Sequence, residues 1–187
     1  MSKILLLILP LVVSCSHLSK KTDERIDIGG GAFLKLNSIK DVLPDIEQVQ
    51  LLTFEHGEKR QTIQTVLKVK DNQMSIVGLM PLGGEVFRVT YIDGVIVARA
   101  PPFMPENFDF KYALADIILI YGGLKNLNVA LENAKVQESS NVRKVSTANK
   151  DLVHIQFEKT DRSKSKVSYD NKIRNYKIQI TPAGGEK

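Results

Sequence analysis

The residue best placed for covalent chemistry is Cys15, the single cysteine of the 187-residue chain. A basic residue and an apolar run over residues 4–13 precede it, and Ser14 stands directly before it. Such a start is typical of a secretory signal peptide, and the run is shorter than the ~20 apolar residues of a membrane-spanning helix. The pattern predicts a lipobox, in which lipid is attached to the Cys15 sulfur and residues 1–14 are cleaved off. A plain secretory signal with an incidental cysteine is the alternative.

The expected anchor determines how the rest of the chain is divided. Two or three acyl chains would hold the protein stably on a membrane, because each buried CH₂ contributes ~0.8 kcal/mol and one chain is not enough. Ser16 follows the cysteine where an aspartate would stand in a retained lipoprotein, which resembles an outer-membrane address. Residues 15–32 are polar and glycine-rich toward their end, which predicts a flexible tether. Residues 33–187 then form one domain of ordinary size.

The sequence offers no set of residues suited to catalysis. Its histidines, His17, His56 and His154, are expected at the surface, and no HExxH, GxSxG or phosphate-binding glycine motif is present. We therefore expect neither enzymatic activity nor a metal or cofactor. Asp116 is the one acidic residue that stands out, because its neighbours are apolar. We expect it on the solvent side of a helix, and a buried acid at a ligand site is the alternative.

The charge of the chain is mildly basic. The formal net charge is +5 at pH 7, and the basic residues are scattered, which argues against a nucleic-acid surface. Arg162, Lys164 and Lys166 form the densest group, in a serine-rich stretch that predicts a solvated loop. Contact of this loop with anionic lipid headgroups is the alternative.

The spacing of apolar residues indicates the elements that must position any site. From residue 49 to residue 100 they recur with a period of two, which predicts a meander of four or five strands, with turns at Asp71-Asn72 and Asp93-Gly94. Residues 107–132 have helical spacing, and the period of two returns from residue 142. The sequence thus predicts an α+β fold, with one strongly curved antiparallel sheet and inserted helices on its concave face. The helical positions are Leu114, Ile117, Ile118 and Tyr121.

Two predicted strand regions, residues 74–80 and 86–97, are apolar on both faces. A sheet with one wet face should alternate more cleanly, so this sheet needs cover on both sides or strong curvature. The helical insertion supplies one cover, and a bound acyl-type ligand could share it; a well-packed core explains the pattern equally. On the ligand interpretation, the cavity is lined by Ile76, Met80, Phe87, Val89, Leu114, Ile117, Ile118 and Tyr121.

Several segments resemble known families. Residues 79–89, LMPLGGEVFRV, are similar to part of the LolB family of outer-membrane receptors, which accept lipoproteins from a periplasmic carrier. Residues 112–127, 143–145 and 175–180 resemble a family of uncharacterised Gram-negative lipoproteins with a LolB-like fold, often encoded beside aryl-polyene biosynthesis genes. Together the resemblance covers about residues 48–181.

The resemblance implies a LolB/LolA-like incomplete β-barrel, or half-barrel, whose helices lid the concave face and whose apolar interior accepts acyl chains. It assigns Leu82, between Pro81 and Gly83, to a loop that contacts the membrane; an ordinary hairpin hydrophobe is the alternative. Residues 39–47 form a shorter segment than the N-terminal helix of LolB, which favours another lipidic client over a second lipoprotein receptor. A LolA-like carrier is the protein partner that the resemblance implies.

We therefore expect a monomeric outer-membrane lipoprotein, facing the periplasm, that binds or transfers a lipid-like molecule. The alternative is an envelope scaffold lipoprotein whose half-barrel is filled by its own side chains and which docks a protein partner. A cavity of ~300 Å³ or more with aliphatic walls favours binding. A closed core with an exposed apolar patch favours the scaffold.

Overall fold

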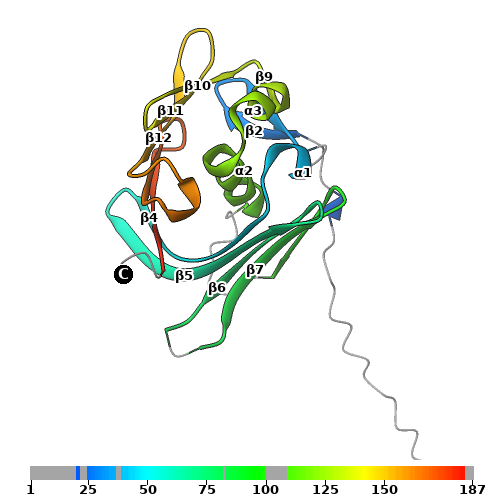
Figure 1. The fold of residues 1–187 in the computed structure, drawn as a ribbon, viewed down its shortest axis with the longest axis vertical. Helices are drawn as coiled ribbons and strands as arrows, with labels where there is room; N and C mark the ends of the chain where they lie inside the picture. Colours follow the sequence, from blue (N-terminus) through cyan, green and yellow to red (C-terminus); the bar gives the residue numbers. More distant parts are fainter. Residues whose placement is uncertain (1–19, 22–24, 37–38, 82, 100–108, 184–187) are drawn as a thin grey trace, which may run out of the picture.

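An eleven-stranded antiparallel sheet dominates the computed structural model, which describes residues 20–21, 25–36, 39–81, 83–99 and 109–183. Cys15, residues 1–14 and Leu82 lie outside the described residues. The strand order is β1-β8-β7-β6-β5-β4-β14-β13-β12-β11-β10, and the sheet curls without closing (Figure 1). Its strands are β1 (Lys20–Lys21), β4 (Ile46–His56), β5 (Lys59–Lys70), β6 (Gln73–Leu79), β7 (Glu85–Ile92), β8 (Val95–Arg99), β10 (Lys135–Ser139), β11 (Val142–Ser146), β12 (Asp151–Phe157), β13 (Val167–Asn171) and β14 (Tyr176–Pro182).

The sheet consists of two meanders that are joined by pairing of β14 with β4. In the first, β4 to β8 follow one another as predicted, and two-residue turns connect β5 to β6 and β7 to β8. Asp71, Asn72, Asp93 and Gly94 have φ angles of 51°, 62°, 48° and 84°, the backbone that such hairpins require. The helical insertion separates this meander from the second, β10 to β14. The α+β class and the curled, unclosed sheet predicted from the sequence are therefore confirmed.

A second, three-stranded sheet has the order β2-β3-β9. It consists of β2 (Arg25–Gly29), β3 (Ala32–Lys35) and β9 (Leu131–Glu132). The prediction of a flexible tether over residues 15–32 is wrong for its described part from residue 25, because Ile26 and Ile28 are 0 % and 2 % exposed. Alternation of these two residues with Arg25 and Asp27 is the period of a strand with one buried face. The glycines after them form the turn of a hairpin.

The helices are α1 (Ile39–Val42), α2 (Phe110–Tyr121) and α3 (Leu124–Ala130), with a short 3₁₀ turn, η1, at Arg162–Lys164. Figure 1 shows α2 inside the curl of the large sheet, and β2 packs against it. All residues from Leu114 to Tyr121 are buried. The sequence predicted one apolar face for this helix, but a helix enclosed by two sheets has no solvent side. This burial on every side determines which polar groups lie in the interior.

Candidate functional site

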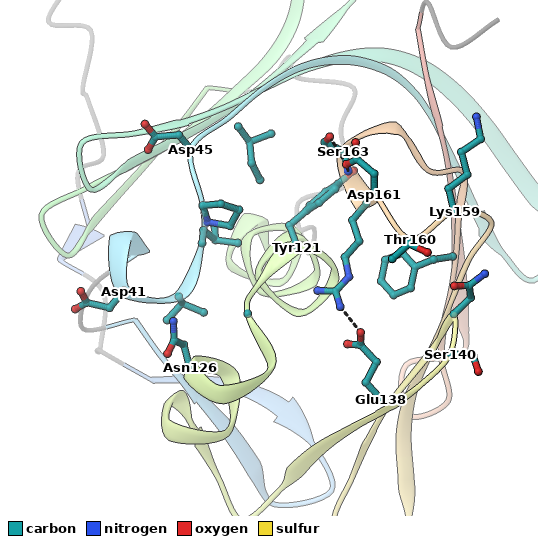
Figure 2. Close-up of a pocket in the computed structure, with 18 residues that line it drawn as sticks. Asp41, Asp45, Tyr121, Asn126, Glu138, Ser140, Lys159, Thr160, Asp161 and Ser163 are labelled. Carbon is teal, nitrogen blue, oxygen red and sulfur yellow. Dashed lines mark hydrogen bonds and ion pairs between the residues drawn. The ribbon is translucent and has the colours of Figure 1, made fainter.

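A pocket of about 750 Å³ lies at the C-terminal end of α2. Its walls come from the loop between α1 and β4, from the start of α3, from the β10–β11 turn and from the connection between β12 and β13. Figure 2 shows Asp41 and Asp45 on one side of the pocket, Glu138 and Asp161 on the other, and Tyr121 between them. Segments distant in the sequence therefore meet around the last turn of this helix.

The pocket has an apolar inner wall and a charged rim. Leu43, Ile46, Tyr121 and Phe157 line it and are each at most 7 % exposed. The charged lining residues are four carboxylates and two cations, namely Asp41, Asp45, Glu138, Asp161, Lys159 and Arg162. Such a pocket suits an amphiphilic molecule, since apolar walls bind hydrocarbon and a few polar groups orient it.

Two arginines bind the backbone carbonyls that α2 leaves unpaired at its end. The Arg143 guanidinium donates to the carbonyl oxygens of Leu119 at 2.7 Å and Ile120 at 3.1 Å. Arg162 donates to the carbonyl oxygen of Gly122 at 3.3 Å. Cations are favoured here because the last carbonyls of a helix carry partial negative charge. The arginines fix the end of α2, and with it the inner wall of the pocket.

Glu138 links these two arginines. Its carboxylate accepts hydrogen bonds from Arg143 at 2.9 and 3.0 Å and from Arg162. Burial raises the pKa of Glu138, but the hydrogen bonds and charges of both arginines outweigh this, and the pKa lies below its ordinary value. Burial, and then the charge of Arg162, lower the pKa of Arg143, although a guanidinium stays protonated at any physiological pH. The network is therefore fully ionised at neutral pH.

A polar cluster lies inside the fold behind Tyr121. Burial raises the pKa of Tyr121 to about 12, so its hydroxyl remains protonated and donates to Gln50 Oε1 at 3.2 Å. Gln50 and Thr65 are paired across β4 and β5, and both are 0 % exposed. Gln48, which precedes Gln50 on the same face of β4, is 9 % exposed. These four side chains place amide and hydroxyl groups in a region otherwise built from aliphatic residues.

Asp116 is a second buried polar group, at the middle of α2. It is 6 % exposed, and its carboxylate accepts hydrogen bonds from the hydroxyls of Tyr169 and, at 2.6 Å, Tyr176. The expectation that Asp116 faces solvent is wrong, because α2 is enclosed on all sides. Burial raises its pKa to about 6, while the hydrogen bonds from the tyrosines act in the opposite direction. The cluster ties the helix to β13 and β14.

The predicted cavity residues lie mostly in the core. Of the eight, Tyr121 alone lines the described pocket. The other buried members, each at most 3 % exposed, pack into one hydrophobic cluster: Ile76, Val89, Leu114, Ile117 and Ile118. Phe87 packs against this cluster, and Met80 is 48 % exposed. Most of the apolar residues that the sequence assigned to a ligand cavity therefore belong to the hydrophobic core around α2.

The predicted membrane-contact loop is the hairpin tip between β6 and β7. Pro81 and Gly83 are exposed, as is Met80 before them. Gly83 and Gly84 have φ angles of 88° and 102°, which a residue with a side chain adopts only with strain. The tip therefore projects apolar and small residues from the sheet, with Leu82 itself outside the described part.

Sequence reasoning missed the arginine network. Arg162 was expected in a solvated loop, but it packs over the Phe157 ring at 5.0 Å and binds Glu138. Arg143 is 0 % exposed. The sequence did contain one indication that Arg143 is buried. Arg143 precedes Val145 by two residues in the same strand, so the two side chains lie on the same, buried face.

In the part of the chain that the structure describes, no helix is long and apolar enough to cross a membrane. Those same residues contain no group of three or more histidine, cysteine or acidic side chains that could hold a metal ion.

The model of a protein family described as "Protein of unknown function (DUF3261)" matches residues 47–184. The chain therefore belongs to this family. The match covers the large sheet from β4 to β14 with α2 and α3, and it covers the pocket lining apart from Asp41 to Ile46, which lie before its start. Comparison with curated proteins finds no match.

Proposed function

We propose that this DUF3261 protein is a LolB-like lipoprotein of the outer membrane that binds, and hands on, a lipid-like molecule. The observation that carries the proposal is the pocket at the end of α2. Its volume of about 750 Å³ lies within the ~300–1,000 Å³ of small-molecule sites. The inner wall of Leu43, Ile46 and Phe157 is apolar, and the rim is charged.

Two further features support placement at a membrane. The lipobox pattern at Val12 to Cys15 would anchor the chain through lipid. At the hairpin tip, Met80 is exposed and precedes Pro81, and Leu82 follows Pro81 in the sequence. An anchored domain with an apolar hairpin tip is suited to exchange of a hydrophobic molecule with a bilayer, or with a LolA-like carrier in the periplasm.

The proposed activity is binding rather than catalysis. The sequence holds no cysteine in the folded domain and no recognised nucleophile motif. Asp116, the buried acid with a raised pKa, is held by two tyrosine hydroxyls in the core. Its geometry suits a structural tie between α2 and the sheet.

A pocket-filling variant tests the proposal. Asn126 lies on α3, is exposed and lines the pocket, so Asn126→Trp should fill part of the cavity without disturbing the core. Lys125→Trp places the same bulk on the neighbouring exposed position, outside the pocket lining. With a fluorescent acylglycerol as probe, Asn126→Trp should weaken binding at least tenfold, while Lys125→Trp should leave it unchanged. Equal binding by both variants would contradict the proposal.

A scaffold function is the second candidate, and one observation favours it. The interior is filled by α2, and Val49 and Leu51, on the face of β4 opposite Gln50, are 38 % and 45 % exposed. A closed core with exposed aliphatic residues is what a docking surface requires. Failure of wild-type protein to bind any acyl probe, together with a stable complex with an envelope protein that Leu51→Asp abolishes, would establish this function instead.

A further inference from the structure

A group of buried polar atoms without partners requires an explanation, such as ordered water or a bound ligand. Gln50 Nε2 and Thr65 Oγ1 have no hydrogen-bond partner among the described residues. The Gln48 amide also has no well-aligned partner there, although it lies near enough to the Tyr121 hydroxyl to act against the rise of its pKa. Gln50 and Thr65 are 0 % exposed. A buried amide or hydroxyl left unpaired lowers stability by ~1–3 kcal/mol, so native folds keep few of them, and each requires an explanation.

These atoms lie next to the pocket. Ile46, which lines the pocket, precedes Gln48 by two residues on the same face of β4, a step of about 7 Å along a strand. Tyr121 lines the pocket, and its hydroxyl donates a hydrogen bond to Gln50 Oε1. The unpaired side chains therefore adjoin Ile46 and Tyr121 of the pocket wall, although they are not themselves lining residues. A ligand would reach them by displacing the Tyr121 side chain.

The charges around the pocket indicate which polar group fits. The unpaired atoms are neutral donors and acceptors, and no cationic side chain belongs to this cluster. The pocket lining carries four carboxylates against two cations. One of these cations, Arg162, is already bound to Glu138 and to Gly122. Arg143 also pairs with Glu138, and Lys164 pairs with Asp161 at 3.7 Å, so the rim is close to neutral and does not select the charge of a ligand. An anionic headgroup would, however, have no counter-ion within the unpaired cluster.

We propose that the cluster of Gln48, Gln50, Thr65 and Tyr121 receives the carbonyl of a neutral acyl ester or amide whose hydrocarbon chain occupies the pocket. This inference rests on the proposed function and specifies its ligand class. The amide N–H groups of the glutamines and the Thr65 hydroxyl donate to the ester or amide oxygen. A free fatty acid of the same chain length is discriminated against, because its carboxylate would be buried unpaired.

The test compares two probes and two variants of the full chain by titration calorimetry. Monooleoylglycerol and oleate share one hydrocarbon chain and differ in charge. Wild-type protein should bind the ester at least tenfold more tightly than oleate. Thr65→Val, which replaces an unpaired hydroxyl with a methyl of the same shape, should weaken ester binding about tenfold. Its stability without ligand should be unchanged or higher, because no hydrogen bond is lost.

Thr62→Val is the matched control. Thr62 lies on the same strand but is exposed, and its hydroxyl is bonded to that of Thr53 at 2.8 Å. This variant should bind the ester like wild type. Gln50→Leu provides a second test on the neighbouring strand and should weaken ester binding in the same way. Its unfolding free energy is measured alongside, because Tyr121 loses the acceptor of its hydroxyl in this variant.

The outcomes separate this inference from the proposed function. Ester binding that is unaffected by Thr65→Val and Gln50→Leu would mean that the cluster holds ordered water only, and would overturn the inference alone. Preference for oleate would also overturn it while leaving a lipid-binding function in place. Absence of binding by either probe would overturn both.

Discussion

Asp116 places a carboxyl group in the interior of the fold, with a consequence for stability. Its pKa in the folded protein is about 6, above the value of 3.8 for an exposed aspartate, because burial disfavours the charged form. The folded state therefore binds this proton more tightly than the unfolded state. The contribution of Asp116 to stability is greatest below pH 4 and decreases as the pH rises to 6. Above that pH the ionised group lowers the free energy of unfolding by about 3 kcal/mol relative to its protonated form.

Substitution of Asp116 by asparagine should remove this pH dependence. We compare the free energy of unfolding of Asp116→Asn with that of wild type at each pH. The difference should shift in favour of the variant by up to ~3 kcal/mol between pH 4 and pH 7, because only wild type buries a charge at the higher pH. Urea unfolding at several pH values measures this difference. Asp151→Asn, at an exposed position, should give a nearly constant difference. A constant difference for Asp116→Asn as well would show that the carboxyl does not titrate in the interior.

At the scale of elements, the C-terminal end of α2 is the junction that supports the pocket. Arg143→Met should lower the free energy of unfolding by about 3–5 kcal/mol, because the carbonyls of Leu119 and Ile120 lose their donor and Glu138 loses one of its partners. Lys144→Met, exposed on the other face of β11, should stay within about 0.5 kcal/mol of wild type. Denaturant unfolding of both variants provides the comparison. A loss below 1 kcal/mol for Arg143→Met would show that the end of α2 is held by packing alone.

The hairpin tip allows a separate test of the proposed membrane contact. In a Cys15→Ala background, which removes the expected anchor, Leu82→Glu should reduce flotation of the protein with vesicles about tenfold. The reason is that an inserted leucine contributes ~1.5–3 kcal/mol. The melting temperature should hardly change, because neighbouring Pro81 and Gly83 are exposed. Ile92→Glu, at the other end of β7, should not affect flotation. A large loss of stability in Leu82→Glu would show instead that Leu82 belongs to the core.

The spacing of apolar residues and the turn motifs predicted most of the strands and helices. The burial of those elements depends on tertiary packing, which local sequence does not show. A period of two identifies strands whatever they pack against, and the two hairpin turns have their own residue signals. The period does not say how many sides of a helix are covered, so α2 was assigned a solvent face. The available signal was that Asp116 is the only polar residue between Leu114 and Ile120. The pocket was missed because its walls come from loops that meet only in the folded chain.

At the scale of the whole molecule, the proposed lipid anchor would hold the proposed binding domain at the membrane. Cys15→Ala should move the protein from the membrane fraction to the soluble periplasmic fraction and abolish metabolic palmitate labelling, because the proposed acyl chains would have no attachment site. His17→Ala, close to the anchor, should remain membrane-bound and labelled. Wild-type protein without any fatty acid would refute the lipoprotein assignment.

Native mass spectrometry of the wild-type protein, released from membranes in mild detergent, tests lipid binding itself. We expect a population that carries one additional molecule per chain, beyond the lipid proposed on Cys15, whose fragments identify a neutral acyl ester or amide. The pocket of about 750 Å³ is within the size range of small-molecule sites, which is the basis for expecting one such molecule per chain. The proposed function would be contradicted if the protein carried only the covalent lipid under conditions in which other lipid carriers keep their ligands.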